Sequence, residues 1–150
     1  MKKVLAFLIL LLLPVLVLAQ APKRKALYFY SETCSHCYKV DQYFTANNSY
    51  NDYEIKKLDA TNPENLKVLN DLFDVYNIAS ENRGWPAVFF GNKILVGDQQ
   101  IIDNFQSEIN STDALNYPTP ETIRSSIEEK NTTPPDEQRT KPSLPISLLI

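Results

Sequence analysis

Apolar and polar positions alternate along the chain with two periods, which predict a succession of strands and helices. Residues 26–30 are continuously apolar or aromatic, as is typical of a buried strand. A helix is expected to begin at the two cysteines that follow, with Cys37, Val40 and Phe44 on one face. Residues 47–49 are polar and are expected to end this helix.

The next segment predicts a second strand and a second helix. Residues 53–58 alternate imperfectly and are expected to form a strand that ends at Asp59. The sequence Asn62-Pro63-Glu64 then opens a helix, because it supplies an N-cap, a proline at the first helical position and an acid in the first turn. The apolar stripe of this helix consists of Leu66, Leu69, Leu72, Phe73, Val75 and Tyr76.

Two short apolar runs predict a β-hairpin. Residues 85–90 and 93–96 are joined by the two-residue loop Gly91-Asn92, which is a strong hairpin signal. Asp98 follows the hairpin and is expected to cap a helix. Its apolar stripe is formed by Ile101, Ile102, Phe105 and Ile109. A weaker final helix is expected to open at residues 119–121.

The first 19 residues have the pattern of a targeting segment. A short positive region precedes residues 4–18, which are almost unbroken aliphatic, and Val17-Leu18-Ala19 fits a cleavage site before Gln20. Residues 1–19 are therefore expected to be a signal peptide or a membrane anchor, and the protein is expected to be exported. Both forms stay open, because the run is somewhat long for a cleaved signal peptide and slightly short for a membrane span of about 20 residues.

One folded domain is expected over residues 26–130. From residue 131 the composition changes, and residues 131–145 are rich in proline and lack periodicity, which predicts a linker. Residues 146–150 form an apolar tail that is too short to cross a bilayer, since a span needs about 20 residues. This tail is expected either to pack on the domain or to open a membrane segment.

Composition and charge narrow the class of protein. The 150 residues are 43% apolar and 11% aromatic, which is enough for one domain with a core. The net charge is −3 and the chain has no basic stripe. Nucleic acid is therefore not expected to be a partner.

The only two cysteines stand three positions apart, in Cys34-Ser35-His36-Cys37, at the start of the first predicted helix. Two sulfurs at this spacing can bond within one helical turn. The helix N-terminus favours thiolate over thiol at Cys34. A disulfide this short would add little as a structural staple, because disulfides stabilise most when they close long loops. The pattern therefore favours a redox site.

The order of elements and two motifs resemble the thioredoxin-like superfamily. The motifs are the Cys34–Cys37 pair and Trp85-Pro86 before the hairpin, and the resemblance covers roughly residues 26–110. It implies an α/β thioredoxin-like fold, in which a central four-stranded mixed sheet is flanked by helices. It also implies a cis peptide bond before Pro86, with this proline next to Cys34, and pairing of the Trp85 backbone with a bound substrate strand.

Two positions depart from the family pattern. Thioredoxins place a buried acid six residues before the first cysteine, and Tyr28 stands there, so that proton-relay role has no occupant. The residue before the proline is usually small or β-branched, and here it is Trp85. The Ser35-His36 dipeptide resembles the Pro-His of periplasmic disulfide oxidases more than the Gly-Pro of cytoplasmic thioredoxins.

Each residue of the site has an expected role in thiol–disulfide exchange. Cys34 is expected to be the nucleophile and Cys37 the resolving thiol. The N–H groups of His36 and Cys37 are expected to donate to the Cys34 thiolate. Protonated His36 would add positive charge and favour an oxidant, whereas the Glu32 carboxylate would disfavour a second negative charge. The direction of electron flow therefore stays open.

The leading hypothesis is an extracytoplasmic thiol–disulfide oxidoreductase that acts on protein thiols without a cofactor or metal. Its expected partners are protein substrates, a redox partner and a membrane, reached through the leader or a further C-terminal segment. One alternative is the redox domain of a larger membrane electron-transfer protein with spans that begin near Ile146. Another is copper or zinc binding by Cys34, His36 and Cys37.

Overall fold

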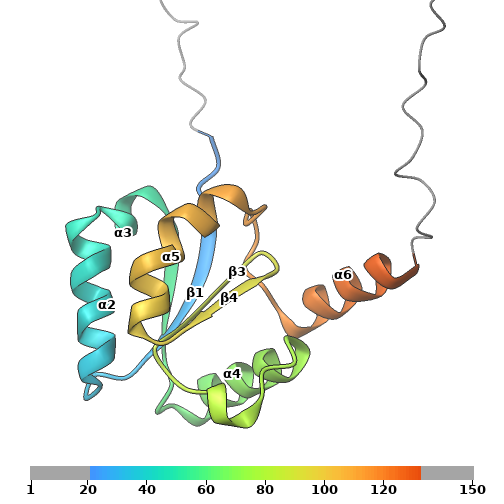
Figure 1. The fold of residues 1–150 in the computed structure, drawn as a ribbon, viewed down its shortest axis with the longest axis horizontal. Coiled ribbons are helices and arrows are strands. Elements are labelled where there is room, and N and C mark those ends of the chain that lie inside the picture. The colour runs from blue at the N-terminus through green and yellow to red at the C-terminus, as the bar shows by residue number, and fades with distance from the viewer. Residues whose placement is uncertain (1–20, 133–150) are drawn as a thin grey trace, which may run out of the picture.

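The computed structural model describes residues 21–132 (Figure 1). The expected leader (1–19), the apolar tail (146–150) and the linker beyond residue 132 lie outside the described residues. Four strands form one mixed sheet in the order β2-β1-β3-β4. They are β1 (Lys25–Tyr30), β2 (Glu54–Asp59), β3 (Ala87–Phe90) and β4 (Lys93–Val96).

Helices flank this sheet. The α-helices among the described residues are α2 (Ser35–Ala46), α3 (Ser49–Asp52), α4 (Pro63–Val75), α5 (Asp98–Ser111) and α6 (Pro120–Thr132), with a short 3₁₀ turn at Ser80–Asn82. The expected α/β class and mixed four-stranded sheet are thus confirmed, and the architecture is compatible with a thioredoxin-like fold. Within residues 21–132, no helix has the length and apolar character that crossing a membrane requires.

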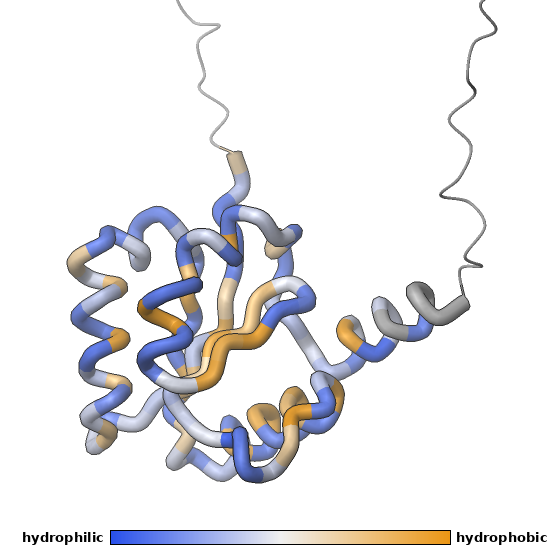
Figure 2. The backbone as a smooth tube through the Cα atoms, in the orientation of Figure 1, coloured by the Kyte–Doolittle hydropathy of each residue, from blue (hydrophilic) through white to orange (hydrophobic). Residues whose placement is uncertain are grey.

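Strand β1 lies at the centre of the fold. It runs parallel to β2 and antiparallel to β3, so that Phe29 is paired with Leu58 on one side and with Ala87 on the other. The four central residues of β1 are buried, and so is all of β3. Burial on both faces explains why these strands are continuously apolar rather than alternating. Figure 2 shows hydrophobic residues concentrated in the hairpin strands and on parts of the flanking helices.

The side chains of β1 divide the core into two layers. Ala26 and Tyr28 contact the cluster beneath α2 and α5, whereas Leu27 and Phe29 belong to the cluster beneath α4. Figure 1 shows the same division, with α2 and α5 together on one side of the sheet and α4 on the other. Successive residues of a strand point to opposite faces, so one six-residue segment anchors both layers.

Two helix starts differ from expectation. Helix α2 ends with Ala46 as expected, but α3 then begins, because Asn48 adopts a left-handed backbone (φ 57°) that redirects the chain into another helical turn. The prediction that Asp98 caps α5 is wrong. Gly97 is the N-cap, with φ 90°, and Asp98 is the first helical residue. Its carboxylate is consequently free to contact another helix.

Candidate active site

The two cysteines lie where β1 gives way to α2. Cys34 is the N-cap of α2, with extended backbone angles (φ −89°, ψ 113°), and its sulfur accepts a hydrogen bond from the Cys37 N–H at 3.1 Å. The two sulfurs are joined in a disulfide across a Cα–Cα distance of 5.2 Å. Two N–H groups, those of His36 and Cys37, were expected to donate to the Cys34 sulfur. The hydrogen bonds among the described residues include the one from the Cys37 N–H.

The two sulfurs differ in access to solvent. Cys34 is partly exposed at the helix start, whereas Cys37 is buried, with 1% of its surface accessible. Glu32 is exposed in the turn just before the pair. A thiolate from another molecule can therefore reach Cys34 and not Cys37.

Tyr28 lies beneath the pair. Its side chain is fully buried, and its hydroxyl donates a hydrogen bond to the Cys37 carbonyl oxygen at 3.0 Å. Burial raises the pKa of Tyr28, and the nearby Asp41 carboxylate raises it further. The hydroxyl thus remains a neutral donor at physiological pH. The position that holds an acid in thioredoxins here holds a hydrogen-bond donor to the backbone of α2.

The peptide bond between Trp85 and Pro86 is cis, as the resemblance implied. Pro86 directly precedes β3, and its carbonyl oxygen accepts a hydrogen bond from the Gly97 N–H at 2.8 Å. Because Ala87 pairs with Phe29, the cis bond lies at the same edge of the sheet as the end of β1, from which the chain leads to the first cysteine. Trp85 is 40% exposed there and offers an apolar surface.

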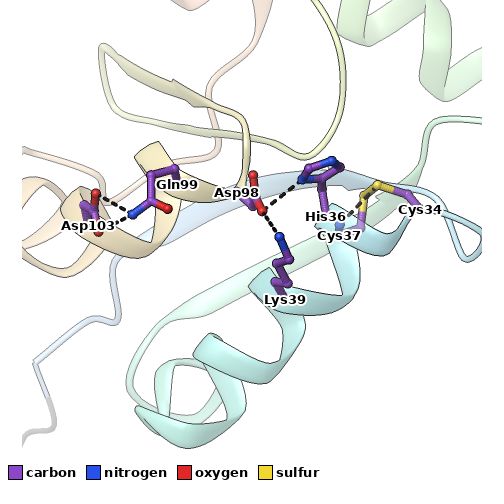
Figure 3. A network of polar contacts seen from close by, with 7 residues as sticks. All are labelled: Cys34, His36, Cys37, Lys39, Asp98, Gln99 and Asp103. Atoms are coloured by element: carbon purple, nitrogen blue, oxygen red, sulfur yellow. Dashed lines mark hydrogen bonds and ion pairs between the residues drawn. A yellow bond between two sulfur atoms is a disulfide. The ribbon is translucent and has the colours of Figure 1, made fainter.

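An ion-pair network joins α2 to α5 beside the disulfide (Figure 3). The Asp98 Oδ2 lies 2.9 Å from His36 Nδ1 and 3.0 Å from Lys39 Nζ. These two hydrogen bonds lower the pKa of Asp98 to about 2, against an ordinary value near 3.8. Sequence reasoning missed this partner of His36, because the two residues are far apart in the chain and the only local signal at Asp98 was that of a helix cap.

Comparisons of the chain with models of known protein families, with curated proteins and with solved structures find no match. Among the described residues, no group of three or more histidine, cysteine, aspartate or glutamate side chains is arranged to hold a metal ion. The alternative of copper or zinc binding gains no support from this part of the chain.

Proposed function

We propose that this domain is an extracytoplasmic thiol–disulfide oxidoreductase of the thioredoxin-like type that exchanges disulfides with protein thiols. The observation that carries this proposal is the bonded cysteine pair at the start of α2, with Cys34 accessible and Cys37 buried. Unequal access gives the exchange a defined order, because only one sulfur can be attacked from outside. The sheet order and the cis bond at Pro86 support the choice of family type.

The reaction consists of two displacements at sulfur. A substrate thiolate attacks Cys34 Sγ, forms a mixed disulfide and expels Cys37 as a thiolate, which takes up a proton. A second substrate thiolate then attacks the substrate sulfur of the mixed disulfide and releases Cys34 as a thiolate. Two substrate thiols are oxidised to one disulfide and the Cys34–Cys37 pair is reduced by two electrons. The reverse sequence reduces a substrate disulfide.

The surroundings of Cys34 suit an extended protein segment as substrate. The Trp85 backbone is the proposed pairing edge for this segment, next to Pro86. The exposed ring of Trp85, next to Pro86, and that of Tyr38, next to Cys37, are 40% and 64% accessible and supply apolar contact area. A redox partner that restores the pair after each turnover is proposed to use the same surface.

Export is a further part of the proposal. The leader at residues 1–19 supports it, and a disulfide persists outside the reducing cytoplasm. Mass spectrometry of the full chain from an exporting host distinguishes a cleaved leader, with Gln20 as the first residue, from a retained membrane anchor. The alternative, a redox domain of a larger membrane protein with spans that begin near Ile146, concerns a segment outside the described residues.

A trapping experiment tests the reaction. In a Cys37→Ser variant, the Cys34 thiolate still attacks substrate disulfides, but no internal thiol resolves the mixed disulfide. We expect covalent complexes with other proteins that dissociate on reduction and are visible on non-reducing gels. The matched control is Cys34→Ser, in which the remaining Cys37 is buried and is expected to trap far less.

Two results together would contradict the proposal. One is the absence of trapped complexes in the Cys37→Ser variant under conditions in which the variant is folded. The other is failure of the wild-type pair to exchange with a small dithiol. An accessible Cys34 sulfur is expected to react with a small dithiol in the wild-type disulfide and with substrate disulfides in the Cys37→Ser variant.

A further inference from the structure

The Asp98 carboxylate on α5 contacts His36, which lies between the two cysteines. It lies at the first position of α5 and is 19% exposed, whereas the His36 side chain is 61% exposed. Figure 3 shows the imidazole extending from α2 towards Asp98, with the disulfide on the other side of the ring. An exposed histidine without such a partner would be free to turn away from the sulfurs.

We propose that Asp98 is a positioning residue for the exchange at Cys34 and acts through His36. It accepts the Nδ1–H of His36 and holds the ring beside the cysteine pair. The inference rests on the proposed function. Its consequence is that the cationic form of the ring is held next to Cys34, where its positive charge stabilises the thiolate of the reduced pair. Stabilising the reduced form makes the pair a stronger oxidant.

A competing role for Asp98 would change the stability of the reduced pair in the opposite direction. A carboxylate near a thiolate repels it directly, so Asp98 alone would destabilise the reduced pair. Asp98 from α5 contacts His36, and Lys39 from the same helix as His36 binds the same carboxylate. Lys39 shares the same carboxylate oxygen, so it offsets part of the Asp98 charge. The sign of the change on removing the carboxylate therefore distinguishes action through His36 from direct repulsion.

The variant Asp98→Asn separates the two roles. The amide oxygen can still accept the Nδ1–H, so the shape of the contact is kept and the negative charge is removed. The measurement is the equilibrium constant of the full chain with a glutathione redox buffer at neutral pH. We expect the equilibrium constant to shift towards the disulfide form by up to about fivefold, the usual limit for an exposed ion pair. This shift corresponds to a reduction potential lower by about 20 mV.

The same substitution in a His36→Gln background is the decisive comparison. Without the imidazole, Asp98→Asn removes only a repulsive charge, so the disulfide form is expected to gain nothing or to lose. Asp103→Asn is the matched control on α5. The Asp103 carboxylate accepts hydrogen bonds from Gln99 on its own helix, at 2.8 and 2.9 Å, and its removal is expected to leave the equilibrium unchanged.

Loss of disulfide stability in the Asp98→Asn variant, no change, or an equal change in both backgrounds would overturn the inference. These results leave the proposed function intact, provided that the wild-type chain exchanges with glutathione. If the wild-type pair does not exchange at all, the proposed function fails and the inference fails with it. The two failures are thus separated by one measurement on the unaltered protein.

Discussion

At the scale of single residues, Tyr28 shows how a buried polar group can support a reactive site without titrating. Its hydroxyl donates to the Cys37 carbonyl oxygen at 3.0 Å, and its ring packs edge-on against Phe44 with centroids 5.5 Å apart. Because burial raises the pKa of Tyr28, the hydroxyl stays protonated near neutral pH. Its contribution is therefore to the position of α2.

A Tyr28→Phe variant measures this contribution. The ring contacts remain and one buried hydrogen bond is lost, so the free energy of unfolding is expected to fall by about 1 kcal/mol. Urea denaturation should show a lower midpoint at unchanged slope. The pH profile of thiol–disulfide exchange is expected to stay the same, since the hydroxyl carries no proton to the sulfurs.

Tyr30→Phe is the control for this variant. Tyr30 ends the same strand, its ring lies beneath Lys57 Nζ at 4.3 Å, and the described residues give its hydroxyl no hydrogen-bond partner. The change in unfolding free energy is expected to stay within about 0.5 kcal/mol. A Tyr28→Phe variant that shifts the pH profile would show instead that the hydroxyl takes part in proton transfer.

At the scale of elements, helix starts and turns could be predicted where residues close in sequence determine them. Asn62 caps α4 through hydrogen bonds from the N–H groups of Glu64 and Asn65, and Gly91 turns the hairpin with φ 52°. Both could be predicted, because an N-cap and a two-residue loop need only neighbouring residues. Helix α3 was missed, since it depends on the left-handed backbone of Asn48, which the sequence does not distinguish from an ordinary loop.

Contacts between elements were harder to predict than the elements. The cysteine pair and the cis bond at Pro86 could be predicted from motifs and a family resemblance. The contact of Asp98 with His36 could not, because it depends on how α5 packs against α2. In that packing, Phe44 from α2 and Phe105 from α5 meet with ring centroids 4.7 Å apart.

This packing yields a prediction. Phe105 is fully buried and also contacts Tyr53 and Phe90, so Phe105→Ala is expected to lower the free energy of unfolding by about 3–5 kcal/mol. Loosening α5 against α2 should also release His36 from Asp98. The chemical shifts of the His36 ring, which belong to the only histidine in the chain, report this change without ambiguity.

The matched control is Phe73→Ala on the other face of the sheet. Phe73 is 1% exposed and belongs to the core layer beneath α4. A similar loss of stability is expected, but the His36 resonances should keep their positions. If both variants move these resonances equally, the α2–α5 contact does not specifically hold the network.

At the scale of the whole molecule, the fully buried Tyr28 and three partly buried tyrosines determine the response to alkali. Burial is the main cause that raises the pKa of Tyr28, Tyr50 and Tyr76, and it raises that of Tyr117 to about 12, from an ordinary value near 10. The folded state therefore keeps these protons at a pH where the unfolded chain releases them. Their stabilising contribution is complete below pH 10 and declines as the pH rises above it.

The expected result is a fall in unfolding free energy of about 1.4 kcal/mol per pH unit above pH 10 for each tyrosine kept fully protonated in the folded state, Tyr28 above all. At acid pH the main lowered pKa is that of Asp98, whose ion pairs contribute above about pH 4 and are lost as the pH falls towards 2. Those exposed ion pairs contribute little to the free energy of unfolding. The domain should thus tolerate acid better than alkali.

Tyrosinate absorbance and circular dichroism, followed together during an alkaline titration, test this asymmetry. Tyr28, which is fully buried, should ionise only as the fold is lost, so that part of the absorbance change coincides with loss of the dichroism signal. Full ionisation near pH 10 with an intact fold would mean that solvent reaches Tyr28, and the tight packing of β1 beneath α2 would then be contradicted.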